Sequence, residues 1–204
     1  MTLVKICGIT RDIDIHYVNE AGPDMVGFIL CQGFRRTVDP EDAKRMRESL
    51  RGPIGSVGVF MDQPVEEVVG IADHIGLDMI QLHGSESDDY IRILKGRTDK
   101  TVIKAFRIEG REDVTAARDS AADLVLLDGG TGDGRTFDWS IIEGFGRDYI
   151  LAGGLTPQNV GEAVRTLRPY AVDTSSGVET EQFKDENKIG AFIKAARATE
   201  GNRR

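Results

Sequence analysis

Short apolar runs alternate with amphipathic segments along the whole chain. The runs are rich in β-branched and other apolar residues and are four to six residues long, as is typical of β-strands. The predicted strands are Leu3–Cys7, Met25–Leu30, Ser56–Phe60, Met79–His83, Val102–Phe106, Leu124–Asp128, Tyr149–Ala152 and Ala171–Thr174.

The segments between these runs have the pattern of helices. Apolar side chains recur at helical spacing, for example along residues 65–72. Pro64 and Pro157 fit first-turn positions, and Thr156 is a candidate N-cap. The predicted helices are Asp12–Ala21, Pro40–Leu50, Pro64–Ile75, Ser87–Lys95, Arg111–Ser120, Trp139–Phe145, Pro157–Thr166 and Asp185–Ala198.

This alternation predicts an α/β protein built from parallel βα units. Over 204 residues each unit takes about 25, close to the compact limit of a single (β/α)8 TIM barrel. A doubly wound sheet is the alternative, but it would more often show a GxGxxG turn after its first strand, and Cys7-Gly8-Ile9-Thr10 is not one. We expect one domain over residues 1–204, with 200–204 as a frayed tail.

Composition fits a soluble protein, with 40% hydrophobic and 29% charged residues. No apolar run approaches the roughly 18 residues that span a bilayer, so no membrane is expected as a partner. Met1-Thr2 leads directly into the first strand, so we expect neither a secretory nor a transit segment. Two cysteines form neither a disulfide framework nor a zinc motif. The expected location is cytoplasmic.

The net charge of −8, from 34 acidic and 26 basic residues, disfavours nucleic acid as a partner. It permits a small anionic substrate, because a local group of N–H donors can bind phosphate in an acidic protein. Three scattered histidines do not suggest a metal site. The sequence leaves the oligomeric state open, and a homo-oligomer is compatible with it.

In a barrel, the active site lies at the C-terminal ends of the strands, where Cys7 ends the first. Cys7 is either a small buried hydrophobic residue or a thiolate base, and the second role needs a pKa lowered from roughly 8.5. Cys31 ends the next strand and is expected to be inert. A disulfide between the two is conceivable but disfavoured in a reducing compartment. Strand alternation places Lys5 and Cys7 on one face.

Other polar side chains end the remaining strands. Asp128 is either a solvated turn residue or, at a barrel mouth, a general acid. His83 is either a neutral hydrogen-bonded side chain or a substrate contact, and Gln81 shares its strand as a second candidate substrate-binding residue. Arg35 and Arg36 follow the second strand, where a charge pair is often solvated but can meet an anionic substrate.

Two glycine-containing loops follow the last two strands. One contains Gly153 and Gly154, and the other contains Ser175, Ser176 and Gly177. Each alone is an ordinary turn signal, but together they occupy the place where phosphate-binding barrels present backbone N–H groups. The pair predicts a phosphate site.

Taken together, these motifs resemble the phosphoribosylanthranilate isomerase family of tryptophan biosynthesis. The matches run in order over nearly the whole chain: KICGIT (5–10), GFIL (27–30), VGVF (57–60), QLHG (81–84), LLD (126–128), FDW (137–139), LAGGLTPQNV (151–160) and DTSSGVE (173–179). The resemblance implies an Amadori rearrangement of a phosphosugar, N-(5-phosphoribosyl)anthranilate, without a cofactor.

The resemblance also implies roles for individual residues. Asp128 would be the general acid that opens the ribose ring, and Cys7 the general base that removes the C2′ proton. Arg36 would meet the anthranilate carboxylate, although the family usually has Ser-Pro-Arg where this chain has Phe34-Arg35-Arg36. The two glycine loops would hold the phosphate. One layer below Cys7, we expect Lys5 to pair with Asp173 across strands one and eight.

The glycine-rich segment 129–132 follows Asp128 at once, where relatives carry a longer segment, and it suggests a lid. Two other functions compete. A related isomerase of histidine biosynthesis, or a bifunctional form, would usually carry an aspartate in place of Cys7. A non-catalytic phosphometabolite-binding barrel would need neither Cys7 nor Asp128.

Overall fold

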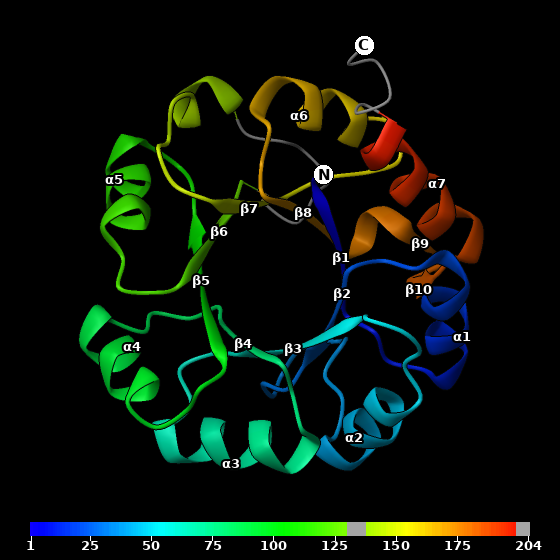
Figure 1. The fold of residues 1–204 in the computed structure, drawn as a ribbon, viewed down its shortest axis with the longest axis horizontal. Coiled ribbons are helices and arrows are strands. Elements are labelled where there is room, and N and C mark those ends of the chain that lie inside the picture. Colours follow the sequence, from blue (N-terminus) through cyan, green and yellow to red (C-terminus); the bar gives the residue numbers. More distant parts are fainter. Residues whose placement is uncertain (130–137, 199–204) are drawn as a thin grey trace.

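The chain folds into a closed barrel of eight parallel strands. A computed structural model describes residues 1–129 and 138–198, so most of the candidate lid segment lies outside the described residues. The strands follow one another in chain order, and β8 pairs with β1 to close the ring (Figure 1). They are β1 Leu3–Cys7, β2 Met25–Ile29, β3 Gly55–Phe60, β4 Met79–Leu82, β5 Thr101–Arg107, β6 Leu124–Asp128, β7 Tyr149–Ala152 and β8 Ala171–Thr174. The predicted (β/α)8 barrel is confirmed.

Helices surround the strands in an outer ring (Figure 1). Side-chain oxygens of Asp39, Ser87 and Asp185 accept hydrogen bonds from first-turn N–H groups and so begin three of these helices. The α-helices are α1 Asp12–Ala21, α2 Pro40–Glu48, α3 Val65–Ile75, α4 Asp88–Lys95, α5 Arg111–Asp119, α6 Val160–Leu167 and α7 Glu186–Arg197. After β8 come a 3-10 turn, η2 Ser176–Val178, and a small antiparallel hairpin of β9 Glu179–Thr180 and β10 Phe183–Lys184.

Two predicted helices differ from the structure. The segment Trp139–Phe145 contains only a 3-10 helix, η1 Trp139–Ile142. Helix α6 begins at Val160 rather than Pro157, because Asn159 closes the preceding turn: its Oδ1 accepts from the Thr156 N–H at 2.8 Å. Thr156 therefore lies before the helix and is not its N-cap.

The core has two layers, which follow from strand alternation. In β1, Val4 and Ile6 pack toward the helices. The barrel interior is filled by a second cluster, which reaches the C-terminal mouth at Ala152. Its members are Met25, Val57, Ile103, Ala105, Leu126, Ile150, Ala152 and Ala171.

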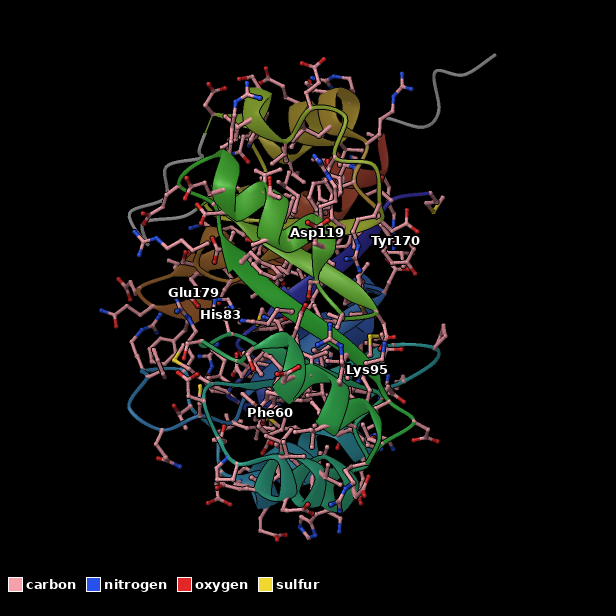
Figure 2. The ribbon with its side chains drawn as sticks, turned by 90° about the vertical axis from the view of Figure 1, so that its left-hand side faces the viewer. Phe60, His83, Lys95, Asp119, Tyr170 and Glu179 are labelled. Atoms are coloured by element: carbon pink, nitrogen blue, oxygen red, sulfur yellow. The ribbon has the colours of Figure 1, made fainter. Side chains whose placement is uncertain are left out.

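At the N-terminal end of the barrel, the same aspartate hydrogen bond links three pairs of neighbouring strands. Asp24, Asp78 and Asp123 each precede an even-numbered strand and accept a hydrogen bond from the backbone of the strand before it, at 2.8–2.9 Å. The opposite end carries the polar side chains. In Figure 2, His83 and Glu179 lie toward one end of the barrel, and Tyr170 and Lys95 lie toward the other.

Candidate active site

A cavity of about 270 Å³ opens at the C-terminal mouth of the barrel. The ten residues expected to act in catalysis, substrate binding or phosphate binding all line it: Cys7, Arg36, Gln81, His83, Asp128, Gly153, Gly154, Ser175, Ser176 and Gly177. They come from six different strand ends or the loops that follow them, so only closure of the barrel brings them together.

Cys7 lies at the end of β1, buried and with a free thiol. Burial raises the pKa of this thiol, and the charge of Lys5 acts in the opposite direction without overcoming it. The lowered pKa expected for a resting thiolate is therefore not found. Cys7 is therefore a protonated thiol at neutral pH.

Lys5 lies directly below Cys7 and is fully buried. Its Nζ donates to Asp173 Oδ1 at 3.0 Å, across the register in which the two residues face each other on β1 and β8. The expected pair is confirmed. Burial acts to lower the pKa of Lys5, but Asp173 and Cys7 outweigh it, so the pKa lies above its ordinary value and the ammonium is retained.

On the other side of the cavity, His83 lies between Gln81 and Asp128. Gln81 Nε2 is 3.0 Å from His83 Nδ1, and His83 Nε2 is 3.7 Å from Asp128 Oδ2. If Nδ1 accepts from the amide, the ring proton sits on Nε2 and faces the carboxylate. Burial lowers the pKa of His83 despite the opposing effect of Asp128, so the ring is neutral near pH 7.

Gln81 itself is 1% exposed, and its Oε1 accepts no hydrogen bond from the described residues. Leaving a buried acceptor unpaired costs about 1–3 kcal/mol. Since Gln81 lines the cavity, a donor on a bound molecule would satisfy it.

Arg36 and Arg35 differ in where they lie. Arg36 lines the cavity, whereas Arg35 lies on the outer side of the same loop with 42% of its side chain exposed. The Arg36 side chain crosses Gly8, whose φ of 74° is left-handed; a Cβ there would come within 2.6 Å of Arg36 Cδ. Strand β1 is thus followed by a glycine, because the Arg36 side chain from the loop after β2 occupies the space that a Cβ would need.

The two glycine loops meet at the β7–β8 side of the cavity. A Cβ at Gly177 would lie 1.9 Å from the Leu155 carbonyl oxygen, so the loops approach more closely than any side chain allows. Among the described residues, no partner accepts a hydrogen bond from the backbone N–H of Gly153 or Gly154. These groups are available to an anion.

A buried ion pair supports the loop that carries His83. Lys104 Nζ lies 3.2 Å from Glu86 Oε2 and donates to the Gly84 carbonyl at 2.7 Å. Glu86 in turn accepts from the Gly84 N–H at 2.9 Å. This contact fixes the loop that follows β4.

The sequence did not single out Glu179 or Lys184 as functional, and it did not place Asp173 in the cavity. Asp173 lines the cavity as well as pairing with Lys5. Glu179 lies within the DTSSGVE motif, so its position in the motif was a usable signal, whereas Lys184 carried none.

Within the described residues, no three His, Cys, Asp or Glu side chains gather as a metal site would require. Across those same ranges, every helix is too short or too polar to cross a membrane.

The fold and this cavity place the chain among the (β/α)8-barrel enzymes that carry their active site at the C-terminal mouth. The family model described as N-(5'-phosphoribosyl)anthranilate (PRA) isomerase matches residues 4–195. The chain belongs to this family.

Individual relatives agree along their whole length. The chain is 46% identical over 208 residues to N-(5'-phosphoribosyl)anthranilate isomerase of Desulforudis audaxviator (strain MP104C), covering 97% of this chain and 98% of the relative. A solved phosphoribosylanthranilate isomerase in complex with reduced 1-(o-carboxyphenylamino)-1-deoxyribulose 5-phosphate has a TM-score of 0.88 at 38% identity, covering 97% and 100%. A structure of monomers generated from the dimeric Thermotoga maritima enzyme has a TM-score of 0.87, also at 38% identity and with the same coverage.

Proposed function

We propose that this chain catalyses the Amadori rearrangement of N-(5-phosphoribosyl)anthranilate to 1-(2-carboxyphenylamino)-1-deoxyribulose 5-phosphate, a step of tryptophan biosynthesis. The observation that carries the proposal is one cavity holding a thiol, a carboxylate, an arginine and two glycine loops. Membership of the family and the ligand of the solved relative support the same reaction.

The cavity is divided in a way that suits this substrate. The loops at Gly153-Gly154 and Ser175-Ser176-Gly177 would hold the phosphate through backbone N–H groups. Arg36 would bind the anthranilate carboxylate. Between them, an apolar wall would receive the aromatic ring; it consists of Ile29, Phe34, Val59 and Met61.

Asp128 would act as the general acid. Its protonated carboxyl would give a proton to the ribose ring oxygen as the C1′–O bond breaks, and the nitrogen lone pair would form the iminium C=N bond. Neutral His83, with Nε2 at 3.7 Å from Asp128 Oδ2, adds no fixed positive charge that would favour the ionised carboxylate. Gln81 Oε1 would accept from a sugar hydroxyl.

Cys7 would act as the general base. Removal of the C2′ proton by its thiolate gives an enolamine, which tautomerises to the ketone, so no net proton is consumed. Because the raised pKa keeps the resting thiol protonated, Cys7 would first have to give its own proton to solvent water and only then accept the C2′ proton. The iminium charge supplies one cation beside Cys7, and buried Lys5 supplies another from below.

Turnover of the wild-type protein with N-(5-phosphoribosyl)anthranilate tests the proposal, with the ketose product separated by chromatography. The phosphosugar substrate of the histidine-pathway isomerase serves as the control substrate. We expect product from the first compound only. Binding of the first compound without turnover would contradict the proposal and favour a non-catalytic binding protein.

A cytoplasmic location and a homo-oligomeric state belong to the same proposal. The dimeric Thermotoga maritima relative supports the second. Light scattering coupled to size-exclusion chromatography would give the mass of the assembly directly. A monomer at all protein concentrations would contradict the proposed homo-oligomer.

A further inference from the structure

Arg36 is held in one orientation by a carboxylate outside the cavity. Glu179 Oε1 accepts from Arg36 Nε at 2.7 Å, and Glu179 Oε2 accepts from Arg36 Nη2 at 2.9 Å. This is a bidentate contact with the side of the guanidinium group, which fixes its plane as well as its position. Gly8 leaves the space through which the side chain passes.

The contact leaves a defined part of the guanidinium unused. A guanidinium group carries five N–H donors, of which Glu179 takes one on Nε and one on Nη2. Of the three that remain, one on Nη1 and one on Nη2 lie along the edge formed by these two nitrogens. Among residues 1–129 and 138–198, this edge has no hydrogen-bond partner, and Arg36 lines the cavity. A second carboxylate can therefore bind this edge with the same two-point geometry.

Glu179 is suited to remain a carboxylate throughout. Burial alone would raise the pKa of Glu179, but hydrogen bonds from Arg36 and the charge of Lys184 lower it to about 2. Arg35 Nη2 makes a further contact at 2.7 Å. One negative charge thus meets three positive ones, and of the three cations Arg36 lines the cavity.

Glu179 is itself fixed by the short hairpin on which it lies. Lys184, almost fully buried, donates from Nζ to Glu179 Oε1 at 3.0 Å and to the Ser175 carbonyl at 2.8 Å. Lys188 Nζ donates to the Glu179 carbonyl at 2.6 Å. The hairpin therefore links the arginine to the loop proposed to hold phosphate.

From this geometry we propose that Glu179 is a positioning residue that presents the Nη1–Nη2 edge of Arg36 to the carboxylate of the substrate. The inference rests on the proposed function, and it adds a residue that acts through Arg36 and contacts no substrate atom. In this proposal, the β9–β10 hairpin keeps Arg36 and the phosphate-binding loop at Ser175 at a fixed separation.

Glu179→Gln tests the proposal, because it keeps the shape of the side chain but removes its charge and one acceptor. Two ligands are titrated by calorimetry: the product 1-(2-carboxyphenylamino)-1-deoxyribulose 5-phosphate and the analogue whose ring lacks the carboxylate. We expect the dissociation constant of the product to rise about tenfold or more and that of the analogue to stay within about twofold. The KM for the substrate should rise together with the dissociation constant of the product, and kcat should change little.

Glu181→Gln is the matched control, since Glu181 lies exposed on the same hairpin and its removal changes the net charge equally. It should leave both constants unchanged. In an Arg36→Ala background, Glu179→Gln should add no further loss for the product, because the residue acts through the arginine. A merely structural role would give additive losses and would weaken both ligands.

Equal product affinity of Glu179→Gln and Glu181→Gln would overturn the inference while leaving the proposed function intact. A wild-type protein that binds the product more tightly than the analogue without the carboxylate, but shows no turnover, would contradict the proposed function and leave the inference intact. Should Glu179→Gln fail to fold, Glu179→Asp withdraws the carboxylate from Arg36 but keeps the charge. Glu179→Asp must show the same selective loss of product affinity, and unchanged product affinity in this variant would count against the inference.

Discussion

Replacement of Lys5 by methionine tests how the buried ion pair beneath Cys7 supports the barrel. The Lys5 side chain is fully buried, and its Nζ lies 3.0 Å from Asp173 Oδ1. Methionine fills a similar volume without charge, so the change leaves Asp173 as an uncompensated carboxylate. Removal of one partner of a buried pair typically costs about 3–5 kcal/mol. Against a usual total of about 5–15 kcal/mol, that loss would be large.

The exposed pair between Arg97 and Glu66 provides the control. These atoms lie 3.1 Å apart, nearly the same separation, but 58% and 72% of the two side chains are exposed. Arg97→Met should therefore cost less than about 1 kcal/mol. The assay is urea unfolding of the three proteins at pH 7, followed by circular dichroism and fluorescence.

The pH must be chosen with the sign of the pKa change in mind. The pKa of Lys5 lies above 10.5 in the folded protein. The stability from its charge is therefore complete below the unfolded-state value and is lost only as the pH rises through the folded-state value. At pH 7 the full effect should be seen. A Lys5→Met protein as stable as Arg97→Met would refute the reasoning.

Lys5→Met has a second consequence for Cys7. Without the cation, burial is less opposed, and the pKa of the thiol should rise further. The alkylation rate of Cys7 by iodoacetamide, measured against pH in a Cys31→Ala background, should shift to higher pH. An unchanged profile would separate Lys5 from the chemistry of Cys7.

Further predictions concern the substrate contacts. Arg36→Ala should weaken substrate binding by about 1.5–3 kcal/mol, the usual scale for a hydrogen bond to a charged group, and Arg35→Ala should weaken it by much less. Steady-state KM values of the two variants measure the difference. A larger rise in KM for Arg35→Ala would assign the carboxylate contact to Arg35. Gly177→Val should raise KM strongly, because its Cβ would lie 1.9 Å from the Leu155 carbonyl and force the loops apart. Inorganic phosphate should compete with substrate and raise the thermal midpoint of the wild-type protein more than that of this variant, and an unchanged KM would remove the loops from the phosphate site.

The sequence predicted what depends on short-range pattern. Alternation in β1 placed Lys5 and Cys7 on one face, and barrel closure then made Asp173 the neighbour of Lys5, as the structure has it. It also predicted which strand ends would meet. The predicted beginning of α6 was wrong, because the Asn159 side chain accepts a hydrogen bond from the Thr156 N–H and this local turn takes the place of the first predicted helical turn.

What could not be predicted depends on contacts between distant residues. Glu179 meets Arg36 across 143 positions of chain, through a hairpin whose strands are two residues each. The direction of the Cys7 pKa likewise depends on how deeply the thiol is buried, and the sequence suggested only that charges would be near.

The central claim is that Cys7 and Asp128 perform the proton transfers, and the turnover number of two variants tests it most directly. Cys7→Ser replaces the thiol by a hydroxyl that barely ionises near neutrality, and Asp128→Asn has no acidic proton to give. Measured with N-(5-phosphoribosyl)anthranilate at saturation, each should lower kcat by about 10²–10⁴-fold with little change in KM. A Cys7→Ser protein with near wild-type kcat would contradict the account, since the thiol would then be only a packing residue.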